Sequence, residues 1–292
     1  ASLSVSQYNS GDAVSCNGGS NGIIDLSISG GIAPYSVNWT GPNGYTSTDI
    51  DITGLEAGTY TALVHDAAGC DTTLSITLTE PPPVQASGIT SDHNGFEVGC
   101  NGSSDGSIDV SATGGAGNFI YQWLGPNAFA SNAEDISGLQ PGVYDVIVND
   151  MNGCKTLLTF TLDAPPAIGT AAVIASAACQ GADDGAIDLT ITGGVMPYDV
   201  QWTGPGGFNA SSEDLTQLFA GIYIATITDA NGCTFSQPYN VSEPGLFTIT
   251  ASTAVYPGGY GVSCAGASDG SIDVTASGGT APLFFSWQGP GG

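Results

Sequence analysis

Basic residues are almost missing from this sequence, which has a single lysine, Lys155, and no arginine. Against them stand 27 Asp and Glu residues, so the formal net charge is −26 at pH 7. Nucleic-acid binding needs clustered Lys and Arg to release counterions from the phosphates, and anionic membrane surfaces need similar clusters. The composition therefore excludes nucleic acid as a partner and gives no electrostatic attraction to a membrane surface.

Long apolar runs are missing too. No stretch approaches the roughly 20 residues of a membrane span, so direct membrane insertion of this segment is not expected. Residues 1–6 lack the basic start of a signal peptide and look like a strand. Hydrophobic residues nevertheless make up 41% of the chain, which is too apolar for a disordered acidic tail. We therefore expect the chain to fold.

A repeat organises the sequence. The order Cys, Trp, Tyr, Cys occurs three times, and the two cysteines have the same spacing of 54 in every set (70−16, 154−100, 233−179). The three sets are Cys16, Trp39, Tyr60, Cys70; Cys100, Trp123, Tyr144, Cys154; and Cys179, Trp202, Tyr223, Cys233. Cys264 and Trp287 begin a fourth set. Such periodicity predicts a tandem array, and since the fourth copy is cut short we expect a segment of a longer protein.

The predicted domains are repeat 1 (1–82), repeat 2 (83–165), repeat 3 (166–244) and a partial repeat 4 (245–292, the N-terminal half only). Only the connections between repeats vary in length. The spacing from one repeat's second cysteine to the next repeat's first is 30, then 25, then 31 (100−70, 179−154, 264−233). Prolines such as Pro81 to Pro83 lie in these connections, and proline-rich linkers are stiff and extended.

Alternating apolar residues predict the fold class. Ile24 and Leu26 flank the outward Asp25, and Val37 shares a face with Trp39, as expected for strands with one buried side. Short strands separated by Gly-Gly, Gly-Pro and Asp-x-x-Gly turns favour an all-β, immunoglobulin-like sandwich of about seven strands in two sheets. The pattern Leu-x-x-Gly-x-Tyr, as in Leu55 to Tyr60, is typical of a tyrosine corner. We predict that the repeated Trp and Tyr residues form the cores, Trp287 included.

The cysteines suggest disulfide bonds. Because the spacing within repeats is constant and the linkers vary, we predict bonds within repeats, with Cys264 left over: Cys16–Cys70, Cys100–Cys154 and Cys179–Cys233. Buried free thiols are the alternative. In a plain immunoglobulin order, however, the two cysteines of a repeat lie at opposite ends of the sandwich, and Cα atoms more than about 7 Å apart cannot be bridged. Disulfides would indicate an oxidising compartment outside the cytosol.

Calcium is the one cofactor for which the sequence offers candidate ligands. Asp66, Asp150 and Asp229 end strands at matching turns, and calcium takes several oxygen ligands. The spacing Asp-x-Asp-x-Asp-Gly of a dedicated site is absent, and Asp is also a common turn former. We favour the turn interpretation and predict no other cofactor.

Catalytic constellations do not recur. His65 and His93 occupy unmatched positions of the repeats, and identical modules do not supply the unique cleft of an enzyme, so we predict no enzymatic activity. Tyr45, Phe129 and Phe208 follow the Gly-Pro turns. They could stack on sugars, but packing over their own hairpins is the favoured interpretation.

Several motifs together resemble the SprB-type repeat of gliding-motility and cell-surface adhesins of Bacteroidetes. In repeat 1 they are Cys16-Asn17-Gly18, Gly30-Gly31-Ile32-Ala33-Pro34-Tyr35, Trp39-Thr40-Gly41-Pro42 and Asp66-Ala67-Ala68-Gly69-Cys70. Repeat 3 departs at Gln180, and repeat 2 has Asn118 in place of the proline. The resemblance implies type IX secretion to the outer cell surface and a role in adhesion or gliding. Thr72 resembles an O-glycan acceptor of such bacteria, and Asn38 lies in an outward-facing N-glycosylation sequon.

Three functions follow from this sequence, in order of preference. The first is a non-enzymatic adhesin stalk that contacts surfaces or glycans. The second is a subunit of an extracellular filament or sheath, whose partners are copies of itself. The third is a carbohydrate-binding module, which needs exposed aromatic residues. Completion of repeat 4 by a strand from another chain is an alternative to simple truncation.

Overall fold

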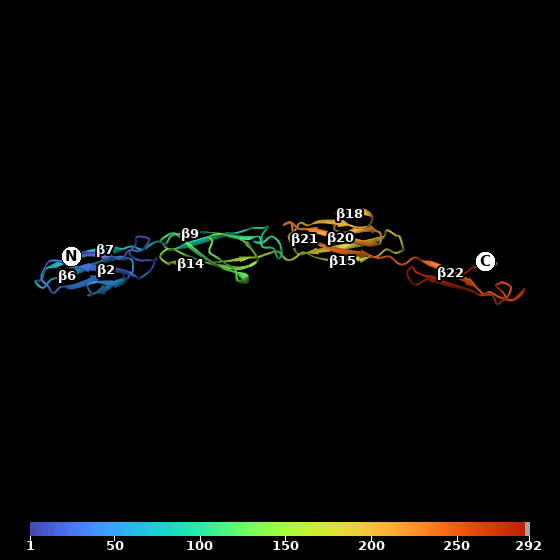
Figure 1. The fold of residues 1–292 in the computed structure, drawn as a ribbon, viewed down its shortest axis with the longest axis horizontal. Coiled ribbons are helices and arrows are strands. Elements are labelled where there is room, and N and C mark those ends of the chain that lie inside the picture. Colours follow the sequence, from blue (N-terminus) through green and yellow to red (C-terminus); the bar gives the residue numbers. More distant parts are fainter. Residues whose placement is uncertain (290–292) are drawn as a thin grey trace. The chain divides into compact units, whose positions relative to one another are not determined.

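The computed structural model describes residues 1–289, so Pro290 of the expected fourth Gly-Pro turn lies outside the described residues. Within them the chain consists of strands and short 3-10 turns, and no α-helix is formed (Figure 1). The chain divides into two compact units, Ala1–Ala164 and Pro165–Gly292. We call them unit 1, which contains repeats 1 and 2, and unit 2.

Repeat 1 is a seven-stranded sandwich of two antiparallel sheets. Three strands form the first sheet in the order β1 (Ser2–Val5), β2 (Gly22–Ser27), β5 (Ile52–Leu55). The second sheet has the order β4 (Thr46–Ser47), β3 (Ser36–Thr40), β6 (Gly58–His65), β7 (Asp71–Leu78). The exposed and buried residues alternate along β2 and β3, as the sequence pattern predicts.

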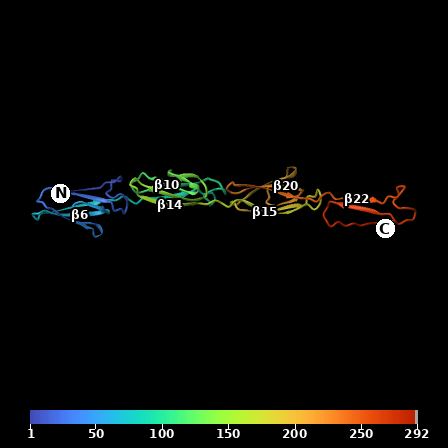
Figure 2. The ribbon, with the colours of Figure 1, turned by 60° about the horizontal axis from the view of Figure 1, so that its bottom comes forward.

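Repeats 2 and 3 have the same topology. Repeat 2 pairs β12 (Ile136–Leu139), β9 (Gly106–Thr113), β8 (Gln85–Thr90) in one sheet and β11 (Ala130–Ser131), β10 (Ile120–Leu124), β13 (Gly142–Asn149), β14 (Lys155–Leu162) in the other. Repeat 3 pairs β15 (Gly169–Ala175), β16 (Gly185–Thr192), β19 (Leu215–Leu218) and β18 (Asn209–Ala210), β17 (Asp199–Thr203), β20 (Gly221–Thr228), β21 (Thr234–Val241). Figure 1 shows β9 and β14, which belong to different sheets, on opposite sides of repeat 2. Figure 2 labels β10 and β14, two strands of the same sheet, within repeat 2. The fold class is therefore all-β, a tandem array of immunoglobulin-like sandwiches.

The repeated Trp and Tyr residues lie in three separate cores. Trp39, Trp123 and Trp202 are each 1% exposed, and Tyr60, Tyr144 and Tyr223 are each 2% exposed. Each indole N–H donates to the backbone carbonyl oxygen of the residue ten positions later, at 2.9 to 3.0 Å. A buried polar group is thereby satisfied in every core.

Repeat 4 differs from the other three. Its described residues form a single two-stranded sheet of β22 (Thr248–Thr253) and β23 (Ile272–Ser277). The prediction that Trp287 lies in a core is wrong for this structure, because its side chain is 61% exposed. In the described part of repeat 4 no second sheet exists against which this indole could pack.

A tyrosine corner closes each complete sandwich. The hydroxyl of Tyr60 donates to the carbonyl oxygen of Glu56, four residues earlier, at 3.1 Å. Tyr144 and Tyr223 make the matching bonds at 3.0 Å. Burial raises the pKa of Tyr60, which keeps the hydroxyl protonated and able to donate.

We expect Tyr60→Phe to lower the free energy of unfolding by about 1 kcal/mol, because the ring stays packed while one part-buried hydrogen bond is lost. Urea unfolding measures the change. Tyr45→Phe is the matched control, since repeats 2 and 3 carry Phe129 and Phe208 at this position. Equal loss in both variants would show that the corner bond contributes nothing of its own.

Candidate functional site at the junction of two repeats

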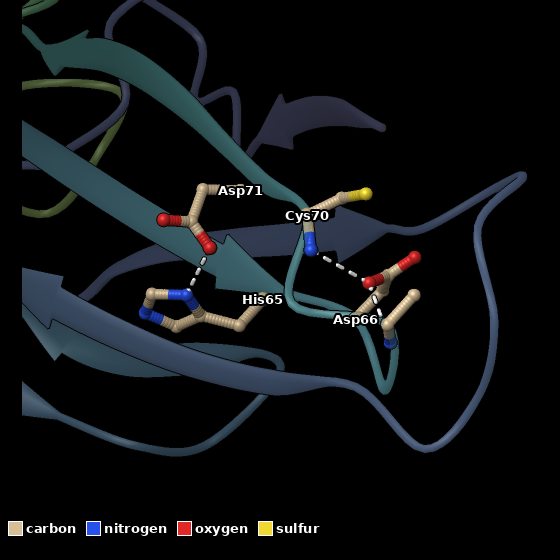
Figure 3. Close-up of polar contacts among 5 residues, drawn as sticks. His65, Asp66, Cys70 and Asp71 are labelled. Carbon is tan, nitrogen blue, oxygen red and sulfur yellow. Dashed lines mark hydrogen bonds and ion pairs between the residues drawn. The ribbon is translucent and has the colours of Figure 1, made fainter.

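The second cysteine of each complete repeat lies in a turn built on an aspartate. In repeat 1, Asp66 Oδ1 accepts hydrogen bonds from the backbone nitrogens of Ala68 and Cys70, both at 2.9 Å, and Oδ2 accepts one from Ile32 at 3.1 Å. Figure 3 shows the nitrogen of Cys70 directed at this carboxylate while its sulfur points away. The aspartate thus ties the cysteine to the Gly-Gly turn that precedes β3.

The same turn occurs in repeats 2 and 3. Asp150 accepts from Asn152 and Cys154 at 2.9 Å and from Ala116 at 2.8 Å. Asp229 accepts three bonds of 2.9 Å, from Asn231, Cys233 and Val195. Asp150 and Asp229 are 3% and 5% exposed. Each calcium candidate is therefore a turn-forming residue whose two carboxylate oxygens accept backbone N–H groups. Among residues 1–289 no cluster of three or more His, Cys, Asp or Glu could hold a metal ion.

The turn of repeat 1 gives a prediction about pH. Backbone N–H groups, first that of Cys70 and then that of Ile32, lower the pKa of Asp66. Stability from this turn is therefore complete above the ordinary aspartate pKa of about 3.9 and is lost as the pH falls through the lower folded-state value. We expect the NMR shift of the Cys70 amide to titrate with a midpoint below about 3.9.

The variant Asp66→Asn is the control for this titration, because it keeps the shape of the side chain and removes the ionisable group. Its Cys70 amide should show no step in the same pH range. A midpoint at or above the ordinary value in the unmodified chain would contradict the role of the N–H donors.

The first cysteine lies at the other end of the sandwich. Its loop is held by Glu80, whose carboxylate accepts from Asn17 Nδ2 at 2.9 Å and from the Gly18 nitrogen at 2.7 Å. Glu80 follows the end of β7, whereas Cys70 comes directly before its start. In unit 2 Glu243 makes the matching bond with the Gly181 nitrogen at 2.6 Å. The glutamate before the linker prolines thus positions the first cysteine in repeats 1 and 3.

The within-repeat disulfides predicted from the spacing are wrong. The strand β7 separates the two ends of repeat 1, and at about 3.3 Å per residue its seven steps span roughly 23 Å. Bonded cysteines need Cα atoms within about 7 Å. The structure instead joins Cys16 of repeat 1 to Cys154 of repeat 2, with their Cα atoms 5.6 Å apart. Cys70 and Cys179 are free and exposed, so Cys179–Cys233 is also excluded.

Polar contacts surround the bond between repeats 1 and 2. The backbone nitrogen of Asn9 donates to Asn152 Oδ1 at 3.1 Å, and Asn9 Nδ2 donates to the Met151 carbonyl oxygen at 3.0 Å. In return, Asn152 Nδ2 donates to the carbonyl oxygen of Ser15 at 2.9 Å. Residues 9–15 of repeat 1 therefore contact the turn that carries Cys154. Sequence reasoning missed Asn9, Ser15 and Asn152.

The linker between repeats 1 and 2 is held at both of its ends. Glu80 contacts the Cys16 loop, as described above, and the carbonyl oxygen of Pro82 accepts from the Gly115 nitrogen at 2.9 Å. The neighbouring Gly114 has φ +81°, and a Cβ there would lie 2.0 Å from the carbonyl oxygen of Pro83. Only glycine fits this approach, which explains the first residue of the Gly-Gly pair.

The remaining predicted positions lie on the surface or over a core. Asn38 and Thr72 are exposed on β3 and β7. Tyr45, Phe129 and Phe208 pack edge-to-face on the buried tyrosines, with ring centroids 5.2 to 5.4 Å apart, so they cover the cores. His65 contacts the carboxylate of Asp71 across the hairpin (Figure 3). The equivalent pairs, Asn149 with Lys155 and Thr228 with Thr234, lack a histidine.

The model of the SprB repeat matches residues 13–44, 97–128, 171–207 and 262–292. The chain carries four SprB repeats. In repeats 1 to 3 the match ends with the 3-10 turn after the core tryptophan. It includes the first cysteine and the Gly-Gly pair of each repeat but not the second cysteine. Among the described residues of these SprB repeats, no helix is long and apolar enough to cross a membrane.

No curated protein matches the chain. Among solved structures it is similar to a tetra-tandem repeat from the extending region of a large adhesion protein, at 13% identity and a TM-score of 0.28, over 94% of this chain and 87% of that one. It is also similar to the N-terminal eight Ig domains of Down Syndrome Cell Adhesion Molecule, at 13% identity and a TM-score of 0.26, over 89% and 41%. A third is extracellular domains 3–5 of Drosophila OTK, at 9% identity and a TM-score of 0.24, over 76% and 90%.

Proposed function

We propose that this chain is a non-enzymatic stalk segment of a repetitive cell-surface or secreted adhesin, which presents contact surfaces at a distance from the cell. Export by the type IX system and a role in gliding-type contact belong to the same proposal. The observation that carries it is the disulfide between Cys16 and Cys154, which couples two successive sandwiches covalently. Such bonds persist outside the cytosol.

A stalk must resist extension under load, and this bond has the required effect. Its two cysteines are 138 residues apart in the sequence. At about 3.4 Å per extended residue, the bond withholds about 47 nm of chain from any force applied at the ends. When either sandwich in unit 1 unfolds, the molecule therefore does not lengthen by the full contour length of that sandwich.

Pulling the chain by its ends in a force spectrometer tests the proposal. With the disulfide intact, the total extension should be smaller than that of the chain in which this bond is broken. Cys16→Ser provides that comparison, and Cys70→Ser, at an exposed free cysteine, is the matched control. Equal extensions for Cys16→Ser and the unmodified chain would show that the bond carries no load.

Electron images of longer arrays of these repeats distinguish the stalk from the filament. Separate strings of repeats support the stalk. Lateral bundles with regular order would support the extracellular filament instead. The sugar-binding alternative loses its expected platform, because the three aromatic residues pack on buried tyrosines.

A further inference from the structure

The outer face of the four-stranded sheet in repeat 2 is apolar. Its strands β10, β13 and β14 are neighbours, and their outward side chains include Leu124, Ile147 and Leu157. Leu124 and Leu157 are 63% and 60% exposed, and all three residues line a hollow of about 470 Å³. Ile120 and Val143, 56% and 52% exposed, extend the apolar surface along β10 and β13. Large apolar side chains gathered on one surface mark an interaction site.

The sandwich forms without this apolar surface. Repeats 1 and 3 have the same topology as repeat 2, but hydroxyl side chains replace both Leu124 and Leu157. The equivalent residues, all of them exposed, are Thr40 and Thr73 in repeat 1 and Thr203 and Ser236 in repeat 3. Because the fold does not require leucine at either position, the two leucines of repeat 2 point to a role outside folding.

Two opposite charges flank the apolar centre of this face. Ile147 pairs with Leu157 across β13 and β14. The exposed Asp145 lies one cross-strand row beyond this pair on one side, and the exposed Lys155 lies one row beyond it on the other. Asp145 Oδ1 accepts a hydrogen bond from the Thr159 hydroxyl at 2.6 Å. Four residues of strand, roughly 13 Å, separate the two charged rows, so the two charges do not pair within one chain.

We propose that this face pairs with the same face of a second copy of the chain. The two-fold axis runs parallel to the sheet and across its strands, at the row that holds Ile147 and Leu157. This axis exchanges the two ends of the strands, so Leu157 of one copy packs on Leu157 of the other. Lys155 of each copy then lies beside Asp145 of the other, as the self-complementarity of a two-fold interface requires.

The charge of the whole chain favours this occupant at this face. Copies with a net charge of −26 repel each other, and Lys155 is the only Lys or Arg that can offset the repulsion locally. It lies on the same face as the apolar hollow. A two-fold interface is closed and does not propagate, so it gives pairs of chains and no filament. The pairing goes beyond the proposed stalk function and does not rest on it.

Sedimentation equilibrium of the oxidised chain in about 0.15 M salt tests the pairing. The exposed free thiols are alkylated first, so that no disulfide joins two copies. We expect a reversible monomer–dimer equilibrium. Leu157→Thr gives repeat 2 the residue that repeat 1 has at this position, and each dimer loses two leucines, so the dissociation constant should rise about 100-fold.

Leu246→Thr is the matched control. It makes the same change at a leucine that is 63% exposed and lies in the connection to repeat 4, and it should leave the dimer unchanged. A chain that stays monomeric up to about 1 mM would overturn the proposal, and so would equal weakening in the two variants.

A charge exchange tests the two-fold register itself. Lys155→Glu leaves only negative charges at the two contacts, and Asp145→Lys leaves only positive ones, so each variant alone should dimerise more weakly than the unmodified chain. An equimolar mixture of the two variants should dimerise again, because each contact then joins opposite charges. A mixture that associates no better than either variant alone would overturn this register. Neither readout depends on whether the chain serves as a stalk.

Discussion

Cys16→Ser is expected to lower the free energy of unfolding of unit 1 by about 5 kcal/mol, according to the chain-entropy estimate for a loop of this length. The bond with Cys154 closes a loop of 138 residues, and without it the unfolded chain regains the conformations that the loop excluded. Urea unfolding of the oxidised chain, followed by tryptophan fluorescence, measures the loss in the free energy of unfolding.

The control for this measurement is Cys70→Ser. It makes the same chemical change at an exposed free cysteine, where the effect should stay within about 0.5 kcal/mol. If Cys70→Ser were the destabilising variant and Cys16→Ser the neutral one, the junction disulfide would not be present in solution.

Trp123→Ala is expected to destabilise repeat 2 by about 3 to 5 kcal/mol, the usual cost of removing a large aromatic side chain from a core. The indole is 1% exposed, and its N–H donates to the Ala133 carbonyl oxygen at 2.9 Å. The substitution leaves a cavity between the two sheets and an unpaired carbonyl group. Chemical unfolding of the chain measures the change in stability.

The neighbouring residue on the same strand provides the comparison. Leu124 points outward and is 63% exposed, so Leu124→Ala should change stability by about 0.5 kcal/mol or less. Similar losses in the two variants would mean that β10 does not place Trp123 in the core as the structure has it.

The sandwich could be predicted because its signal is local and repeated. Ile24 and Leu26 alternate with polar residues, and the same alternation returns in each copy, so the buried face of every strand can be assigned from the sequence. Tyr60 could be placed at its corner because the hydrogen-bond acceptor is only four residues away. The turn role of Asp66 could be predicted because Asp is a common turn former, and its partners Ala68 and Cys70 are close in the sequence.

The disulfide partner could not be predicted from spacing. The interval between Cys16 and Cys70 returns unchanged in the other repeats because both positions belong to one rigid sandwich, whether or not they are bonded. The conflict with the immunoglobulin strand order pointed to the answer, since it places the two cysteines at opposite ends. What was missing was the packing of one repeat on the next, in which Asn9 contacts the distant Asn152.

A covalent link from Cys16 to Cys154 also changes what a single break in the backbone does to the molecule. A protease that cuts anywhere between these two cysteines, including the linker after Leu78, leaves both pieces attached through sulfur. After such a cut, the two pieces separate only when the disulfide is reduced or when a second cut falls outside residues 16–154. A protein built in this way tolerates an isolated cut within this loop, because the pieces on either side of the cut stay joined.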